Sequence, residues 1–183
     1  MCSKTNKLIL RLQLITIKEC QKNQLDLLHA IAIQTYNDTY QYLWVDKGAW
    51  YLNEFYKKES FEKELSAPDI FYFLVYDEDK TIGYFKLMNL ALDPYMESDC
   101  IEIDKLYLLK DYGGKGIGKI IMEFIFGFSQ KQKRSVLWLK AMEDCPARHF
   151  YEKFGFIQTD KSFLNYPTIK EDERSILTMV KEI

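Results

Sequence analysis

Residues 101–119 of the chain read IEIDKLYLLKDYGGKGIGK and continue as IIMEFIFGF over residues 120–128. The first part, residues 101–109, predicts a strand, and a glycine-rich connection follows at residues 110–116. Apolar residues then recur at helical spacing and predict a helix that faces the core: Ile117, Ile120, Ile121, Phe124, Ile125 and Phe128. The fold is inferred outward from this order of strand, turn and helix.

The glycine-rich turn at residues 112–119 has the features of an anion site. Glycines let the backbone approach a phosphate closely, and free N–H groups at a helix N-terminus point toward it. Lys115 and Lys119 add positive charge. A purely structural left-handed turn is the alternative interpretation.

Two well-known phosphate templates fit this turn poorly. The P-loop pattern requires Ser or Thr after its GK pair to ligate magnesium, and Ile120 occupies that position. The dinucleotide fingerprint requires GxGxxG, but Gly118 comes one residue too early after Gly114 and Gly116. A nucleotide-hydrolysing P-loop protein is therefore disfavoured.

The turn resembles motif A of the GNAT acetyltransferases, (Q/R)-x-x-G-x-(G/A). Gly116 and Gly118 match its two small positions, and Gly113 stands where that family usually has Gln or Arg. The resemblance implies that backbone amides of the turn cradle the pyrophosphate of coenzyme A.

The resemblance extends over residues 10–183. Leu106-Tyr107-Leu108 matches the strand before motif A, ARHFYEKFGF at residues 147–156 matches the family's A-x-x-F-Y-x-x-x-G-F, and residues 81–87 are similar to its third strand. Within the family the chain looks most like bacterial spermidine/spermine N-acetyltransferases, through residues 35–40 (TYNDTY), 101–107 and 156–159. The acidic stretch typical of those enzymes near the C-terminus is replaced by residues 165–172.

Two catalytic residues are implied by the resemblance. Glu102 would be the general base, directly or through water, because an ammonium must lose a proton before its nitrogen can attack. A period of two places Glu102, Asp104, Leu106 and Leu108 on one face of the strand. Tyr151 would donate a proton to the departing thiolate. The alternatives are a solvated carboxylate at a strand edge and an aromatic residue of the core.

The resemblance also implies binding residues for both substrates. The backbone of Leu106 and Leu108 would pair with the pantetheine arm of acetyl-CoA, and the turn would hold the pyrophosphate. The cofactor-binding residues expected on this basis are Leu106, Tyr107, Leu108, Gly113, Gly114, Lys115, Gly116, Ile117, Gly118 and Lys119. Tyr36, Asp38 and Asp104 are the candidates for binding a cationic acceptor. For Asp38 an ordinary helix end is the alternative.

The remaining segments complete an α/β (α+β) pattern. A strand over residues 10–17, a helix capped by Asn23 and two short helices at 50–56 and 60–65 precede a hairpin at residues 71–88. After the central helix we expect a strand at 135–140, a helix that begins at Pro146 and ends at Gly155, and strands at 156–163 and 175–180. The resemblance implies a GNAT fold, with a twisted, mostly antiparallel sheet flanked by helices, and one domain over residues 1–183.

Composition narrows the class of protein. The formal net charge is −2 and no basic block stands out, so no nucleic-acid partner is expected. Four scattered Cys and two His predict neither disulfides nor a metal site. Residues 1–17 do not read as a secretory signal, and residues 117–128 are too short to span a bilayer. We expect a cytoplasmic protein with no membrane partner, and a homodimer is one candidate assembly.

The sequence therefore predicts an enzyme that transfers an acetyl group from acetyl-CoA to the primary amine of a small molecule by direct attack. A polyamine is the leading candidate acceptor. Two alternatives stay open: a non-catalytic module that binds acyl-CoA, and acetylation of a protein or peptide amine.

Overall fold

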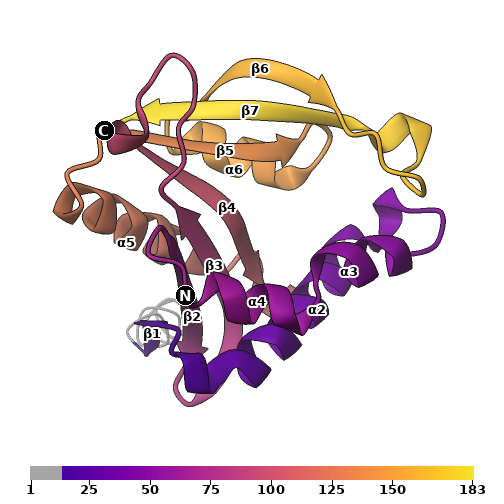
Figure 1. Cartoon of the computed structure of the whole chain (residues 1–183), viewed down its shortest axis with the longest axis horizontal. Coiled ribbons are helices and arrows are strands. Elements are labelled where there is room, and N and C mark those ends of the chain that lie inside the picture. The colour runs from indigo at the N-terminus through magenta and orange to yellow at the C-terminus, as the bar shows by residue number, and fades with distance from the viewer. Residues whose placement is uncertain (1–13) are drawn as a thin grey trace, which may run out of the picture.

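A twisted seven-stranded sheet forms the centre of the molecule in the computed structural model, which describes residues 14–183 (Figure 1). Its strands lie in the order β1-β2-β3-β4-β5-β7-β6, and every neighbouring pair is antiparallel except β4 with β5. The strands are β1 (Ile15–Glu19), β2 (Ile70–Asp77), β3 (Lys80–Met88), β4 (Cys100–Leu108), β5 (Val136–Met142), β6 (Ile157–Phe163) and β7 (Ser175–Glu182). The predicted fold class is confirmed.

Helices cover both faces of this sheet (Figure 1). They are α2 (Leu25–Tyr40), α3 (Ala49–Phe55), α4 (Lys58–Glu64), α5 (Ile117–Lys131) and α6 (Pro146–Lys153). Helix α2 packs on β3, β4 and α4, whereas α5 lies on the opposite face. The predicted cap at Asn23 is wrong, because a 3₁₀ turn occupies residues 22–24 and Gln24 is the N-cap of α2.

Stacked phenylalanines attach α5 to the sheet. Phe73 of β2 and Phe85 of β3 stack with ring centroids 4.8 Å apart, and Phe124 of α5 meets them edge-on at 5.1 and 5.7 Å. Phe73 and Phe85 are both almost fully buried. Burying a ring of this size contributes about 2–3 kcal/mol, and edge-to-face pairs add to it. The packing fixes where α5 begins, next to the end of β4.

Strand β4 contains a bulge at Asp104. Lys105 pairs with Lys86 of β3 and Ile103 pairs with Leu87, so Asp104 is an extra residue with no partner opposite. An inserted residue reverses the alternation of side chains beyond it.

The bulge corrects the predicted face of β4. Glu102 opposes Met88 and Tyr107 opposes Tyr84, two residues on the same side of β3, so Glu102 and Tyr107 share a face. Leu106 instead opposes Phe85, on the face that carries α5. The expectation that Glu102 lies on one face with Leu106 and Leu108 is therefore wrong.

Strands β4 and β5 separate partway along their length. Their parallel pairing joins Cys100–Ile103 to Val136–Leu139 and stops there. Beyond this point β4 stays with β3, and β5 stays with β7 as far as Met142. One edge of residues 104–108 is left open in the middle of the sheet, at the place where the sequence predicts cofactor binding.

The other predicted elements agree with the structure to within a few residues. Strand β1 begins at Ile15, and residues 10–13 of its predicted range lie outside the described residues. Pro146 is the first residue of α6. Gly155 follows the end of α6 with φ of +83°, a conformation that favours glycine.

We expect Gly83→Ala to destabilise the protein by about 2–3 kcal/mol, because overpacking against backbone is costly. A Cβ on Gly83 would lie 3.0 Å from Leu108 Cα and closer still to the carbonyl oxygen of Tyr107. Gly127→Ala is the control, since a Cβ there meets nothing within 4 Å inside α5 and should stabilise the helix by about 0.5–1 kcal/mol. Urea unfolding of both variants provides the measurement, and equal effects would contradict the close approach.

Candidate active site

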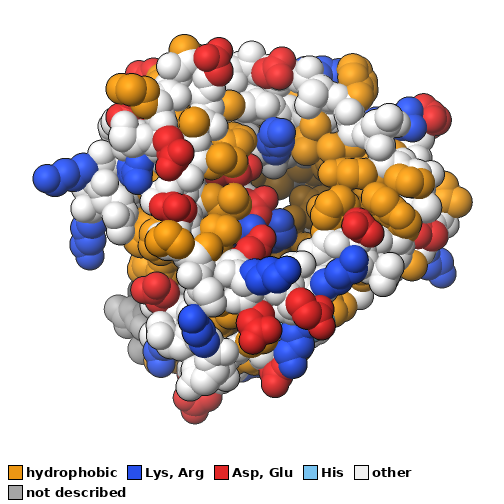
Figure 2. Space-filling view, viewed as in Figure 1, with side chains coloured by type: hydrophobic (Ala, Val, Ile, Leu, Met, Phe, Trp, Pro, Cys, Tyr) orange, Lys and Arg blue, Asp and Glu red, His pale blue; other side chains and the backbone are white. Residues whose placement is uncertain are grey.

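Two cavities meet where β4 and β5 separate. The larger, of about 240 Å³, is the aromatic cavity, walled by Tyr36, Tyr40, Trp44, Tyr51, Tyr107 and Tyr166. The smaller, of about 120 Å³, is the splay cavity, lined by Ile103, Leu106, Leu108, Ala141, Ala147 and Tyr151 among others. Four residues line both cavities: Tyr40, Asp104, Tyr107 and Lys140. The cavities are therefore neighbours at the bulge in β4. A hollow rimmed by hydrophobic side chains is visible on the face of the molecule that Figure 2 presents.

The wall of the aromatic cavity is a connected set of rings. Tyr36 of α2 and Tyr51 of α3 stack in parallel with centroids 5.0 Å apart. Trp44 lies 5.0 Å from Tyr51, and Tyr166 lies 5.8 Å from Tyr51. Because these rings come from two helices, the connection between them and a C-terminal loop, packing between distant segments creates the cavity. Tyr36 thus lies in the cavity wall, and its role in substrate binding stays a prediction.

Glu102 lines the aromatic cavity and is only 9% exposed. Burial raises its pKa from the ordinary 4.5 to about 7, and the charge of Asp104 raises it further against the opposing effects of Lys105, Lys140 and Lys86. A carboxyl group with a pKa near 7 can accept a proton and release it again at neutral pH.

Asp104 belongs to an ion-pair network around the buried side chain of Lys86. Its Oδ2 lies 3.1 Å from Lys86 Nζ and 2.8 Å from Lys105 Nζ. Lys86 is 4% exposed and also binds Glu64 at 2.9 Å, and the Tyr72 hydroxyl donates to the same Glu64 carboxylate. Burial opposes ionisation of Asp104, but Lys105 and Lys86 outweigh it and hold its pKa below the ordinary value. Asp104 therefore stays charged while its neighbour Glu102 can be neutral.

Tyr151 lines the splay cavity from α6 and is 7% exposed. Its ring contacts Phe150 and Phe156, with centroids 5.2 and 5.7 Å away. Burial raises the pKa of its hydroxyl, and Cys145 adds to the shift, so the group keeps its proton at neutral pH. Tyr151 is therefore a hydrogen-bond donor in the lining of the cavity that adjoins the one lined by Glu102.

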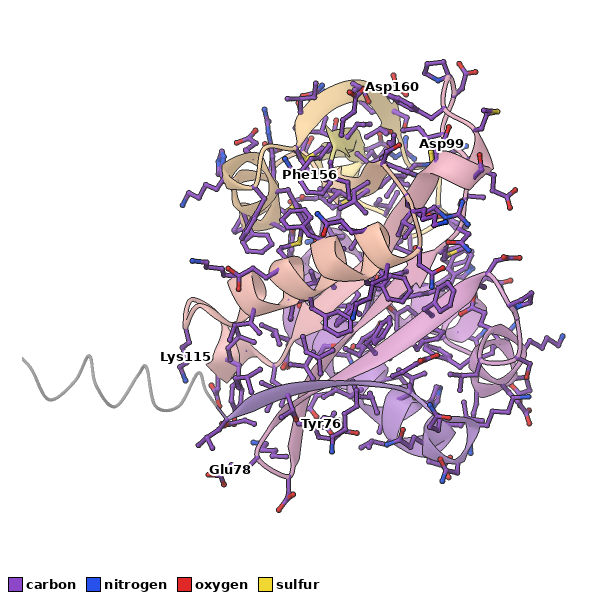
Figure 3. All side chains as sticks on the ribbon, turned by 90° about the vertical axis from the view of Figure 1, so that its left-hand side faces the viewer. Tyr76, Glu78, Asp99, Lys115, Phe156 and Asp160 are labelled. Carbon is purple, nitrogen blue, oxygen red and sulfur yellow. The ribbon has the colours of Figure 1, made fainter. Side chains whose placement is uncertain are left out.

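The glycine-rich turn leads directly into α5. Gly116 is the N-cap of the helix with φ of +84°, and Gly114 has φ of +70°, so both adopt left-handed conformations that favour glycine. The first amides of an α-helix have no partner within it and can bind an anion. Lys115 lies in the turn before α5 (Figure 3), with its Nζ 5.2 Å from the ring centre of Tyr112.

Two other glycines of the turn, Gly118 and Gly113, differ in what a side chain at their positions would contact. A Cβ on Gly118 would lie 2.9 Å from Phe150, so this glycine lets α6 pack closely against the start of α5. Gly113 has φ of −64°, and a Cβ there would make only an ordinary contact with the carbonyl oxygen of Lys110. The backbone at Gly113 would therefore accept the larger residue that the family pattern has there.

The structure brings most of the predicted site residues together, with one exception among the candidates for substrate binding. Glu102, Asp104 and Tyr36 line the aromatic cavity, and Leu106 and Tyr151 line the splay cavity. Asp38 is exposed on α2 and lines neither cavity. Its role stays a prediction.

Sequence reasoning missed several residues of the site. The sequence pattern could have revealed Lys86, because this lysine interrupts the apolar strand TIGYFKL at residues 81–87. No sequence pattern pointed to Tyr51 and Tyr166, since their contact depends on how α3 and the loop before β7 pack. Lys105 and Lys140 line the aromatic cavity as well and read in sequence as ordinary strand residues.

Residues 14–183 contain neither a cluster of metal ligands nor a membrane-spanning helix. No group of three or more His, Cys, Asp or Glu side chains in this part of the chain is placed to hold a metal ion. None of the helices described in it has the length and apolar character needed to cross a bilayer.

Comparison with known proteins identifies the family. Residues 31–156 match the Acetyltransferase (GNAT) family, and this match covers more than half of the chain. The chain therefore belongs to the GNAT acetyltransferase family. A curated relative, an uncharacterized N-acetyltransferase in the pepI 3' region of Lactobacillus delbrueckii subsp. lactis, is 26% identical over 171 residues, which are 91% of this chain and 96% of the relative.

Solved structures agree on the fold. A PaiA N-acetyltransferase from Thermoplasma acidophilum, in complex with coenzyme A, has a TM-score of 0.72 and 22% identity, over 92% of this chain and 99% of that one. The spermidine/spermine N-acetyltransferase SpeG from Vibrio cholerae has a TM-score of 0.66 and 15% identity, over 94% of each chain. At these identities the likeness confirms the GNAT fold and leaves the acceptor unassigned.

We expect the Glu102→Gln substitution to increase the free energy of unfolding, relative to the unmodified protein, more strongly as pH rises. Folding raises the pKa of Glu102 from 4.5 to about 7, so its contribution to stability is complete below 4.5 and is lost as pH rises through 7. Gln cannot ionise, so relative to the unmodified protein the variant should gain about 2–3 kcal/mol between pH 4.5 and 8.5. Urea unfolding at the two pH values measures this gain.

Glu143→Gln is the matched control for that experiment. A hydrogen bond from Lys161 lowers the pKa of Glu143 below 4.5, so the stability that ionised Glu143 contributes is lost only at lower pH and this variant should change little between the two pH values. A constant stability difference between Glu102→Gln and the unmodified protein at both pH values would contradict the burial effect.

Proposed function

We propose that this protein transfers an acetyl group from acetyl-CoA to the primary amine of a small molecule. One observation carries the proposal: a carboxyl group with a pKa of about 7 and a protonated tyrosine line adjoining cavities at the open part of β4. Acyl transfer between an amine and a thioester needs a base on the amine side and a proton donor on the thiol side. We assign Glu102 to the first role and Tyr151 to the second.

The open edge of β4 and the start of α5 fit acetyl-CoA. Residues 104–108 have no strand partner on the β5 side, so their amides and carbonyls are available to the amide groups of a pantetheine arm. At the end of that edge, the backbone of the left-handed turn at Gly114 and Gly116 and the N-terminus of α5 suit a pyrophosphate. The coenzyme A complex of the Thermoplasma relative supports this assignment.

Glu102 acts on the amine in the proposed reaction. It accepts a proton from the nitrogen, directly or through one water, which leaves a lone pair for attack on the thioester carbonyl carbon. Lys105 and Lys140, which line the same cavity, disfavour a positive charge on the nitrogen and so assist its deprotonation. Asp104, already paired with Lys86 and Lys105, is the poorer base of the two carboxylates.

Tyr151 acts on the sulfur. As the new carbon–nitrogen bond forms, the carbon–sulfur bond breaks, and the thiolate takes the hydroxyl proton of Tyr151. The nitrogen loses a second proton as the amide forms, and this proton reprotonates the Tyr151 phenolate through solvent. Glu102 then releases its proton to solvent, so the net reaction yields the amide, the thiol and one proton. No acetyl group is attached to the protein in this route, which makes it a direct attack.

Several expectations from the sequence remain proposals. The acceptor class that the spermidine/spermine resemblance suggests is a polyamine, and the SpeG likeness supports that candidate only through the fold. A peptide amine and a non-catalytic acyl-CoA module are the alternatives. We also propose one domain over residues 1–183, a cytoplasmic location and a homodimer as the candidate assembly.

We expect Gly116→Asp to weaken acetyl-CoA binding at least about tenfold more than Gly116→Asn, because the carboxylate repels the pyrophosphate at short range. Asn has nearly the same size and tolerates the same left-handed backbone, so the pair isolates the charge. Titration calorimetry measures both affinities. Equal losses in the two variants would place the pyrophosphate elsewhere.

We expect Tyr151→Phe to lower kcat on the order of 10²–10⁴-fold, as loss of a general acid does, with little change in acetyl-CoA affinity. The assay follows free thiol released from acetyl-CoA in the presence of an amine. Tyr95→Phe serves as the control, because the Tyr95 hydroxyl binds Glu182 at 2.8 Å and Tyr95 lines neither cavity. An unchanged kcat in Tyr151→Phe would return this residue to a purely structural role.

A further inference from the structure

The walls of the aromatic cavity favour a flat, apolar ligand. Six rings line it, and the ring centre of Tyr51 lies 5.0 Å from those of both Tyr36 and Trp44, in one stacked and one tilted contact. Rings of a ligand can join such a set by stacking or edge contacts. The remaining apolar part of the lining consists of Leu43, Met142, Leu164 and Ile176.

The volume of the cavity suits a ligand with one or two rings. A dry cavity of about 150 Å³ is large enough to hold benzene. The aromatic cavity, at about 240 Å³, has room for one ring and a short aminoalkyl chain. It opens toward the splay cavity at Tyr40 and Tyr107, where an amine would reach the thioester.

The carboxylates that line the cavity can serve one amine group. Among the described residues that line it, the carboxylates are Glu102 and Asp104. Glu102 takes the proton of the reacting amine in the proposed mechanism, and Asp104 is already bound to Lys86 and Lys105. A second ammonium group would have no carboxylate left to pair with.

Nearby lysines add repulsion against a second cation. Lys105 and Lys140 line the cavity, and Lys86 lies directly beneath Asp104 at 3.1 Å. Lys86 is itself paired with both Glu64 and Asp104, so the lining sets Lys105 and Lys140 against Glu102 and Asp104 and has no excess negative charge to attract a second cation. A ring face attracts a cation only weakly compared with the cost of burying an unpaired charge.

We infer that the acceptor is a monoamine with an aromatic or similarly bulky apolar body, and that spermidine-like polyamines are poor substrates. This inference rests on the proposed acetyl transfer and names the substrate class of the same site. The apolar body lies among the aromatic rings, and the single amine lies between Glu102 and the thioester. The reaction is unchanged: the new bond is to the amine nitrogen, and the thiol leaves with a proton.

The test compares 2-phenylethylamine with spermidine and cadaverine in the thiol-release assay. We expect kcat/KM for 2-phenylethylamine to exceed that for either polyamine at least about tenfold. Calorimetry with coenzyme A present measures binding of the same amines without turnover, and 2-phenylethylamine is expected to bind more tightly.

Variants test whether the preference for 2-phenylethylamine arises in the aromatic cavity. Tyr166→Ala should reduce kcat/KM for 2-phenylethylamine at least about fivefold, whereas Tyr166→Phe should retain it. Phe163→Ala is the control and should leave kcat/KM unchanged, because the Phe163 ring is 68% exposed and lies outside the cavity. Lys140→Glu removes one repelling charge and adds a carboxylate, so it should raise spermidine activity relative to 2-phenylethylamine, whereas Lys140→Arg should not.

The outcomes separate the inference from the proposed function. Faster acetylation of spermidine than of 2-phenylethylamine would overturn the inference and leave acetyl transfer standing. Tight binding of 2-phenylethylamine without thiol release from any amine would overturn the proposed function and leave the ligand class of the cavity standing. Absence of both binding and thiol release would overturn both.

Discussion

The short parallel pairing between β4 and β5 is the constraint on which the site depends. It lasts for four residues and stops at Ile103 and Leu139, after which each strand keeps only its outer neighbour. Backbone groups in the middle of a sheet normally find partners in the next strand, so an internal opening supplies donors and acceptors for a ligand. The bulge at Asp104 falls directly after the last paired residue. It turns Glu102 toward one cavity and leaves Leu106 toward the other, so the two halves of a transfer reaction can meet across a single strand.

One buried lysine organises the charges around that strand. Lys86 holds Glu64 at 2.9 Å and Asp104 at 3.1 Å, and Asp104 also binds Lys105. A buried charge is costly unless it is paired, so this network keeps Asp104 ionised. Glu102 has no such partner in its cavity and its pKa is near 7. Two carboxylates two residues apart in sequence therefore differ in protonation because their surroundings differ, which is what a proton-accepting role requires of one and a binding role of the other.

Local sequence predicted much of this structure, and the failures have identifiable physical causes. The turn at residues 112–119 and the start of α5 were predicted because a helix start, a left-handed glycine and an apolar period of 3.6 are encoded within a few residues. Pro146 and Gly155 fixed the ends of the helix that carries Tyr151 in the same way. The orientation of β4 was predicted wrongly, since a period of two assumes an uninterrupted ladder and the bulge adds one residue.

By itself, the sequence determined the order of elements and the glycine turn, because each depends on spacing within one segment, and its resemblance to the GNAT family suggested the two residues proposed for proton transfer. The tertiary structure decided the cavities. Tyr51 and Tyr166 are more than one hundred residues apart in the chain, yet their ring centres lie 5.8 Å apart in one wall. Lys86 becomes buried beside Asp104 only through the register of β3 against β4. Cross-strand register and long-range packing are set by the whole core, so no local pattern carries them.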